Sequence, residues 1–82
     1  MNICFIAGKI ISDRQFEFII NSKNISICTF EIQIDNKNTI IVKGYNEIAD
    51  TCYRKFIKSD YVCIQGYINN KMEIIIEDIE IF

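Results

Sequence analysis

Hydrophobic and polar residues alternate along most of this chain, with the period of two that is typical of half-buried β-strands. The pattern is clearest over residues 25–35, where every second position from Cys28 to Ile34 is apolar. It predicts strands over residues 2–11, 15–20, 25–35, 39–44, 61–69 and 71–82. Polar segments at 12–14, 21–24, 35–38 and 69–70 predict the turns between them.

Gly8 interrupts the first apolar run, and a glycine inside a strand marks a bend or a bulge. We therefore expect residues 2–11 and 15–20 to form one bent strand, which makes five strands in all. Phe16 and Phe56 are assigned to the core. The strands are predicted to point these residues inward: Cys4, Ile6, Gly8, Ile10, Cys28, Phe30, Ile32, Ile34, Ile40, Val42, Gly44, Val62, Ile64, Gly66 and Ile68.

One segment, between the third and fourth predicted strands, has helical spacing. Asn46 is a candidate N-cap, and Lys55 and Lys58 lie near the expected C-terminal end, where cations are favoured. One face of this helix carries Ile48, Ala49, Cys52, Phe56 and Ile57. Five strands with such a helix match the OB-fold plan. We therefore predict an all-β, five-stranded OB-fold barrel, in a single domain over residues 1–82, with one α-helix between strands 3 and 4 that closes the bottom.

The composition limits the kinds of metal, cofactor and catalytic site that the chain can form. The chain has no histidine, and its four cysteines, Cys4, Cys28, Cys52 and Cys63, form no Cys-x-x-Cys pair, so we expect no metal and no cofactor. Buried, reduced thiols in a cytoplasmic protein are the default. No apolar run is long enough to span a membrane. No nucleophile elbow or glycine-rich phosphate loop occurs, so we expect a binding protein and not an enzyme.

Five segments in order, 2–10, 29–34, 41–49, 58–68 and 72–82, resemble the bacterial single-stranded DNA-binding protein (SSB) family. The resemblance covers nearly the whole chain. It implies non-sequence-specific binding of single-stranded DNA, assembly as a homodimer or homotetramer, and partners among DNA replication proteins. Whether RNA is also bound is left open.

The chain departs from the family where bases are usually stacked. Lys37 stands roughly where a tryptophan precedes the third strand, and Lys43 stands where a phenylalanine precedes Gly44. Stacking contributes about 1–3 kcal/mol per base, so we expect any nucleic-acid site here to be short and weak, or organised differently.

The candidate nucleic-acid site is the outward face of the third strand and the turns around it. Thr39, Ile41 and Lys43 share that face, Lys37 precedes it, and Lys23 and Lys71 occupy the first and last hairpin turns. Lys9 and Arg14 are expected to border the same region. Such cations can track a phosphate backbone, although turn lysines also serve simply to keep a surface soluble. A net charge of −2 and Glu31 on the neighbouring strand weaken the field.

Two tyrosines, Tyr45 and Tyr67, follow Gly44 and Gly66 and are predicted to point outward near one another's strands. They can stack bases, cover the barrel wall or form a subunit contact. Ile3, Phe5 and Ala7 form an apolar stripe outside the first strand. By the resemblance, this stripe is the oligomer interface; coverage by the chain's own turns is the alternative. Residues 77–82 resemble an acidic partner-recruiting tip, but their alternation predicts a strand.

Two functions remain. The first is SSB-like binding of single-stranded nucleic acid through lysine–phosphate contacts with limited aromatic stacking. The second is an OB-fold protein-interaction or assembly module without significant nucleic-acid binding, which the missing aromatics and the negative charge favour.

Overall fold

The computed structural model describes residues 2–21 and 23–82. Ser22, part of the predicted turn at 21–24, lies outside the described residues. The elements in chain order are β1 (Cys4–Ile10), β2 (Gln15–Ile19), β3 (Ile25–Gln33), β4 (Thr39–Tyr45), α1 (Glu47–Lys55), β5 (Tyr61–Ile68) and β6 (Ile74–Ile81).

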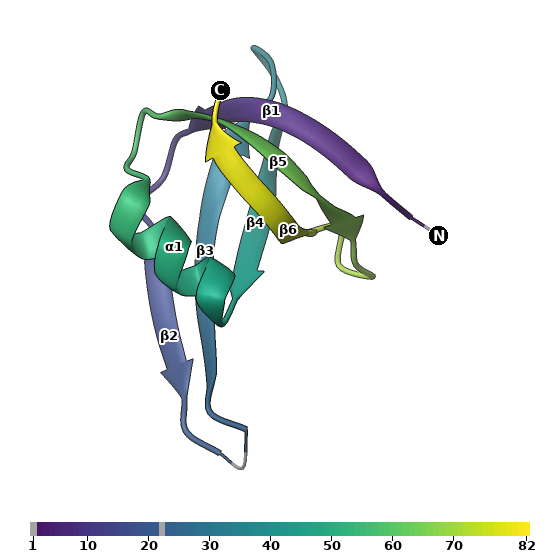
Figure 1. Cartoon of the computed structure of the whole chain (residues 1–82). Coiled ribbons are helices and arrows are strands. Elements are labelled where there is room, and N and C mark those ends of the chain that lie inside the picture. Colours follow the sequence, from purple (N-terminus) through teal and green to yellow (C-terminus); the bar gives the residue numbers. More distant parts are fainter. Residues whose placement is uncertain (1, 22) are drawn as a thin grey trace.

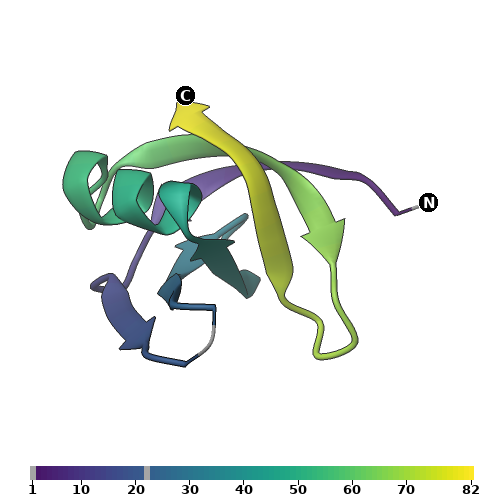
Figure 2. The same ribbon diagram turned by 60° about the horizontal axis from the view of Figure 1, so that its bottom comes forward.

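Five of the strands close into a barrel in the order β1-β5-β6-β4-β3 (Figures 1 and 2). Pairing of β1 with β3, at Lys9–Gln33 and Ile10–Ile32, completes the ring. All pairings are antiparallel except that of β4 with β6. The all-β OB-fold barrel is thus confirmed, as is the helix between the third and fourth predicted strands, which are β4 and β5.

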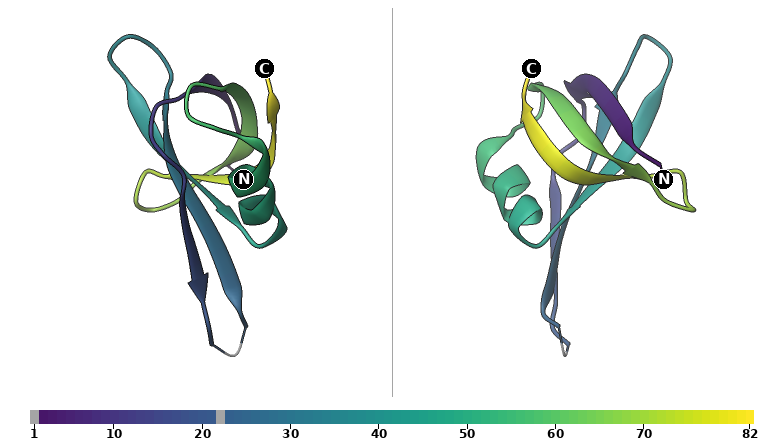
Figure 3. Two further views of the ribbon diagram at one scale, coloured as in Figure 1. Left: turned by 90° about the vertical axis from the view of Figure 1, so that its left-hand side faces the viewer. Right: turned by 45° about the vertical axis from the view of Figure 1, so that its right-hand side comes forward.

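The predicted bent first strand is two strands, because the chain changes partners at residues 11–14. Ile10 N–H donates to the Asp60 carbonyl, whereas Ile11 N–H donates to the Glu31 carbonyl. Ser12 Oγ then accepts from Glu31 N–H at 2.8 Å, so a side chain takes the place of a ladder carbonyl. Beyond this break, β2 pairs with β3 outside the barrel, and the two extend as a hairpin arm (Figure 3).

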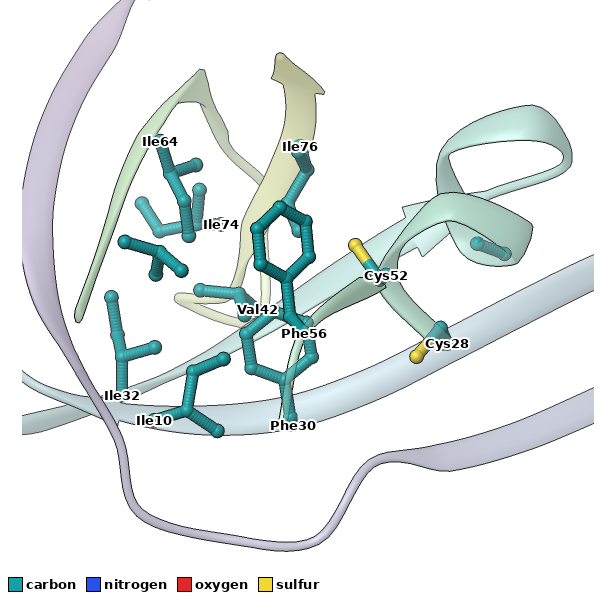
Figure 4. Close-up of a cluster of buried hydrophobic side chains, with 12 residues drawn as sticks. Ile10, Cys28, Phe30, Ile32, Val42, Cys52, Phe56, Ile64, Ile74 and Ile76 are labelled. Atoms are coloured by element: carbon teal, nitrogen blue, oxygen red, sulfur yellow. The ribbon is translucent and has the colours of Figure 1, made fainter. Parts of the chain in front are cut away.

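Alternating side chains of the strands fill the barrel. Along β3 every second residue is buried, as the sequence predicts. Phe30 and Phe56 lie near the centre of the core, surrounded by isoleucines and by Val42 (Figure 4). The inward positions predicted on β1, β4 and β5 are all buried or half-buried.

Three predicted core residues are exposed instead. Phe16 is 38% exposed because β2 lies beyond the barrel, and its ring packs 5.1 Å from that of Tyr53 on the helix. Ile34 follows the last residue of β3, and Ile57 follows the end of α1. Each therefore lies just past the element that would have turned it inward.

α1 packs against β3, β4 and β6 and covers one end of the barrel, as expected (Figure 3). Ala49 and Cys52 are its buried residues. Asn46 precedes the helix, but its side chain makes no cap; its φ of 57° turns the amide away, and Oδ1 accepts from Ser26 N–H at 3.4 Å. The N-cap prediction is therefore right in position and wrong in chemistry.

The β5–β6 hairpin ends in a longer turn than the two residues predicted. Asn69 Oδ1 accepts from the backbone N–H groups of Lys71 and Glu73, so β6 begins only at Ile74. The pairing of β5 with β6 also shifts its register at Gln65–Gly66. A Cβ atom on Gly66 would lie 2.0 Å from the Ile75 carbonyl oxygen, so only glycine fits there. The predicted C-terminal strand is confirmed, since β6 continues to Ile81.

Candidate nucleic-acid interface

The outward residues of β3 and β4 form the face on which the sequence predicts the candidate site. Cross-strand pairs place Gln33 beside Thr39, Glu31 beside Ile41 and Thr29 beside Lys43. Thr39, Ile41 and Lys43 are exposed or half-exposed, as expected for outward positions. We call this surface the β3–β4 face.

One row of residues crosses the β3–β4 face and continues onto β6, at the buried Ile75, and onto β5. Register pairs join Tyr67 to Ile75, Ile75 to Lys43 and Lys43 to Thr29. Because adjacent strands lie about 4.8 Å apart, Tyr67 and Lys43 stand about 10 Å from each other across β6. We call this line the Lys43 row.

A second row runs in the other direction around the barrel. Gln33 pairs with Thr39 on one side and with Lys9 on the other, and Lys9 pairs with Tyr61. We call this the Lys9 row. The two rows cross β4 at Thr39 and Lys43, which are four positions, or about 13 Å, apart along the strand. Each row thus combines an exposed tyrosine with a lysine.

Acidic groups lie between and beside the rows. Lys43 Nζ lies 3.2 Å from Glu73 Oε2, with both side chains largely covered. The pKa of Glu73 is lowered, first by the hydrogen bond from the Asn69 amide and then by Lys43, so Glu73 stays ionised and offsets the lysine charge. Thr39 Oγ1 donates to Glu31 Oε2 at 2.6 Å.

A hollow of about 360 Å³ opens in the middle of the face, between the two rows. Its lining consists of Ser12, Asp13, Gln15, Thr29, Phe30, Glu31 and Ile41. Two carboxylates, those of Asp13 and Glu31, border it, so phosphate groups are repelled from its centre. Anionic ligand atoms are favoured only along the lysine-bearing margins.

The predicted turn lysines are not all gathered at this face. Lys37 lies at the Thr39 end of β4, in a turn where Asp35 Oδ1 accepts from the N–H groups of Lys37 and Asn38. Lys71 lies in the β5–β6 turn, close enough to Glu73 to lower its pKa further. Lys23 lies at the tip of the β2–β3 arm; the nine residues of β3 separate it from Lys37 by about 30 Å (Figure 1).

Arg14 does not border the face, contrary to expectation. Its guanidinium carbon lies 5.1 Å from the ring centroid of Tyr53 on α1, and Nη1 donates to the Tyr53 carbonyl. The side chain therefore ties β2 to the helix, on the opposite side of the sheet from the β3–β4 face.

The two predicted stacking residues are separated as well. Tyr45 and Tyr67 are 37% and 41% exposed, but β6 lies between their strands, and Tyr45 pairs across to Ile27. Tyr61 is an aromatic candidate in the sequence, outside the predicted site; it joins the Lys9 row and packs 6.4 Å from Phe82. The sequence contains this information, because Tyr61 and Tyr67 are an even number of residues apart on one strand and therefore share its outward face.

The apolar stripe on β1 is uncovered. Phe5 is 75% exposed, Ile3 is also exposed and Ala7 is half-buried. β1 pairs with β5 over its full length, but with β3 only at Lys9 and Ile10. The second edge of β1 therefore has no strand beside it from Cys4 to Gly8, within the part of the chain that the structure describes.

Residues 2–21 and 23–82 contain no group of three or more His, Cys, Asp or Glu side chains arranged to hold a metal ion. Among the same residues, no helix has the length and apolarity needed to cross a membrane. All four cysteines are free; Cys28 and Cys52 are buried.

Comparisons with known proteins show the fold. No protein-family model and no curated protein matches the chain. The SSB domain of a Synechococcus sp. protein superimposes with a TM-score of 0.87 at 15% identity, over 98% of this chain and 94% of that one. PriB from Ralstonia solanacearum does so with a TM-score of 0.84 at 12% identity, over 100% and 99% of the two chains.

The single-stranded DNA-binding protein from Thermus aquaticus has a TM-score of 0.84 at 13% identity, and this chain covers 40% of its length. At such low identity the likeness establishes the fold alone. The OB-fold barrel of this chain is of the kind found in SSB domains, in agreement with the resemblance read from the sequence.

Proposed function

We propose that this protein binds single-stranded nucleic acid, with single-stranded DNA as its principal ligand, without sequence specificity. One observation carries the proposal: the Lys43 and Lys9 rows each set a lysine and a tyrosine on one continuous outer wall of an SSB-type barrel. OB-folds bind oligonucleotides on this wall. Backbone cations with aromatic platforms are the combination that non-specific single-strand binders use.

The mechanism follows from the charge distribution. Phosphates are held at the margins by four lysines, where counterion release drives binding. These are Lys9, Lys37, Lys43 and Lys71, and Glu73 competes with the phosphate for Lys43. Bases lie against Ile41 in the middle of the face, where the carboxylates repel phosphates, and on the exposed rings of Tyr61 and Tyr67 at the β5 ends of the two rows. Lys23, at the tip of the β2–β3 arm, and Tyr45, two residues beyond Lys43 on β4, make at most a peripheral contribution.

A paired substitution tests the site. Lys37→Ala with Lys43→Ala should weaken oligonucleotide binding equally for all sequences and lower the slope of log K against log salt by about 0.7 for each lysine–phosphate pair removed. Arg54→Ala with Lys55→Ala is the matched control, because it removes two cations from α1, which lies against the inner side of the barrel wall. Equal affinity and slope for the two double variants would refute the assignment.

An assembly module without nucleic-acid binding is the second candidate, and the Lys43–Glu73 ion pair favours it. In that case the β3–β4 face is a protein contact and its lysines balance the chain's own carboxylates. A labelled oligonucleotide that stays unbound at low salt would support this function.

We further propose that the protein is a homo-oligomer, a dimer or a tetramer, whose subunits pair through Ile3, Phe5 and Ala7 on β1. The open edge of β1 and its exposed apolar stripe support an isologous contact, in which each copy supplies the same strand. A role in the cytoplasm beside DNA replication proteins fits such a protein.

A further inference from the structure

A second surface, unrelated to the β3–β4 face, lies along one edge of β6. This strand pairs with β5 along its length, but on its other side it meets β4 only at Ile74 and Ile75. Past that point, no strand of the described chain pairs with this edge. Its length, from residue 76 to residue 81, is about 20 Å.

The backbone groups at this edge can be identified from the hydrogen-bond pattern. Phe82 N–H donates to the Tyr61 carbonyl of β5 at 2.9 Å. In an antiparallel pair, the backbone groups of successive residues point to opposite sides. The N–H and C=O groups of Ile79 and Ile81 therefore point toward the open edge, where unpaired strands recruit other chains.

α1 runs beside this edge (Figure 3). Two adjoining hollows, of about 170 and 430 Å³, lie between them and share Thr51 and Ile79. We call them together the α1–β6 channel. Glu47, Ile48 and Asp78 complete the lining of the first hollow. Lys55, Phe56, Glu80 and Ile81 complete the lining of the second.

The channel has an apolar floor and an acidic rim. Phe56, Ile79 and Ile81 supply carbon surface, whereas Glu47, Asp78 and Glu80 outnumber the single cation, Lys55. Negative charge repels nucleic-acid phosphates. It also disfavours a second copy of this strand, because two β6 edges laid together would bring like-charged side chains into register.

We propose that the α1–β6 channel binds an extended segment of a partner protein, in which apolar and basic residues alternate. The segment adds a strand to β6 by pairing with the backbone of Ile79 and Ile81. Strand addition draws affinity from such main-chain bonds and specificity from alternate side chains. Its apolar residues face Phe56 and α1, and its basic residues lie beside Asp78 and Glu80.

The test uses the full chain and a fluorescein-labelled peptide of alternating valine and lysine at low salt. Anisotropy should rise with protein concentration, and the amide resonances of Ile79 and Ile81 should shift. Methylating the peptide nitrogens that face the edge should weaken binding at least about tenfold, because each methyl group removes a strand hydrogen bond. This control leaves the protein unaltered.

Protein variants test the charge requirement. Glu80→Lys, at an exposed position, should weaken binding of the valine–lysine peptide about tenfold or more. Glu17→Lys, an equal charge change on the exposed β2 arm, should leave it unchanged. Four results would overturn the proposal: no binding, equal binding of a valine–glutamate peptide, equal binding of the methylated peptide, or β6 amide shifts caused by self-association alone.

Discussion

At the scale of single residues, the balance between Lys43 and Glu73 sets the charge of the candidate interface. The two side chains lie 3.2 Å apart, and the Asn69 amide holds Glu73 in place from the other side at 2.9 Å. A phosphate must therefore compete with an internal carboxylate for Lys43. The strength of this competition is measurable.

Replacing Glu73→Gln frees Lys43 while keeping the shape and the hydrogen-bonding capacity of the side chain. We expect severalfold tighter oligonucleotide binding at low salt and a steeper salt dependence, by about one phosphate contact. Asp50→Asn is the control, because it removes one negative charge from an exposed position of α1, outside the face. If both variants bind alike, Lys43 does not contact the ligand.

The buried thiols make stability depend on pH in the alkaline range. Burial raises the pKa of Cys52 from 9.0 to about 12, and burial also raises that of Cys28. The folded protein keeps these thiols protonated, whereas the unfolded chain releases the protons above pH 9. The stability that the protonated, buried thiols contribute is therefore fully present below pH 9 and is lost as the pH rises toward 12.

Urea unfolding between about pH 8 and pH 10, under reducing conditions, measures this decline. The free energy of unfolding should fall by at most about 1.4 kcal/mol per pH unit for Cys52 above pH 9. Cys52→Ala lowers stability at every pH by removing buried volume, but its stability should decline less steeply with pH. Identical slopes for the two proteins would show that Cys52 does not titrate in this way.

At the scale of elements, period-two alternation predicts every strand, because most strands bury one face and expose the other, although β2 is exposed along its whole length. It fails at residues 11–14, where the break depends on Ser12 Oγ accepting from Glu31, a contact between distant segments. It also fails at Phe16, since alternation tells which residues share a face but not whether anything covers that face. Alternation also does not predict the pairing of β1 with β3 that closes the barrel, because it does not tell which strands lie beside one another.

β1 is the element on which oligomerisation is proposed, and Phe5 is the residue to change. Its ring is 75% exposed, so Phe5→Glu should leave the stability of the isolated subunit nearly unchanged while placing a charge inside the contact. Sedimentation velocity should show a dimer or tetramer for the parent chain and a monomer for the variant.

Phe18→Glu on the β2 arm provides the comparison, since Phe18 is also exposed and apolar but lies away from β1. This variant should sediment like the parent. A monomeric parent chain, or an oligomer that persists in the Phe5→Glu variant, would contradict assembly through β1.

At the scale of the whole molecule, the sequence predicts the barrel better than the site. The alternation along β4 predicts that Lys43 points outward, and the structure agrees. The rows require the pairing of β4 with β6 and of β1 with β3, which no local pattern reports. Contacts with Tyr53 hold Arg14 away from the face, and the length of β3 sets Lys23 about 30 Å from Lys37, although sequence reasoning groups both with the face.

The net charge of −2 makes binding by the whole molecule depend on local cations and hence on salt. Anisotropy of a labelled poly-dT oligonucleotide, titrated with protein at low salt and again at rising salt, is the most direct test. The account predicts saturable binding at micromolar protein or below, weakening steadily with salt and similar for a mixed-sequence strand. An oligonucleotide that stays free at high protein concentration and low salt would contradict it.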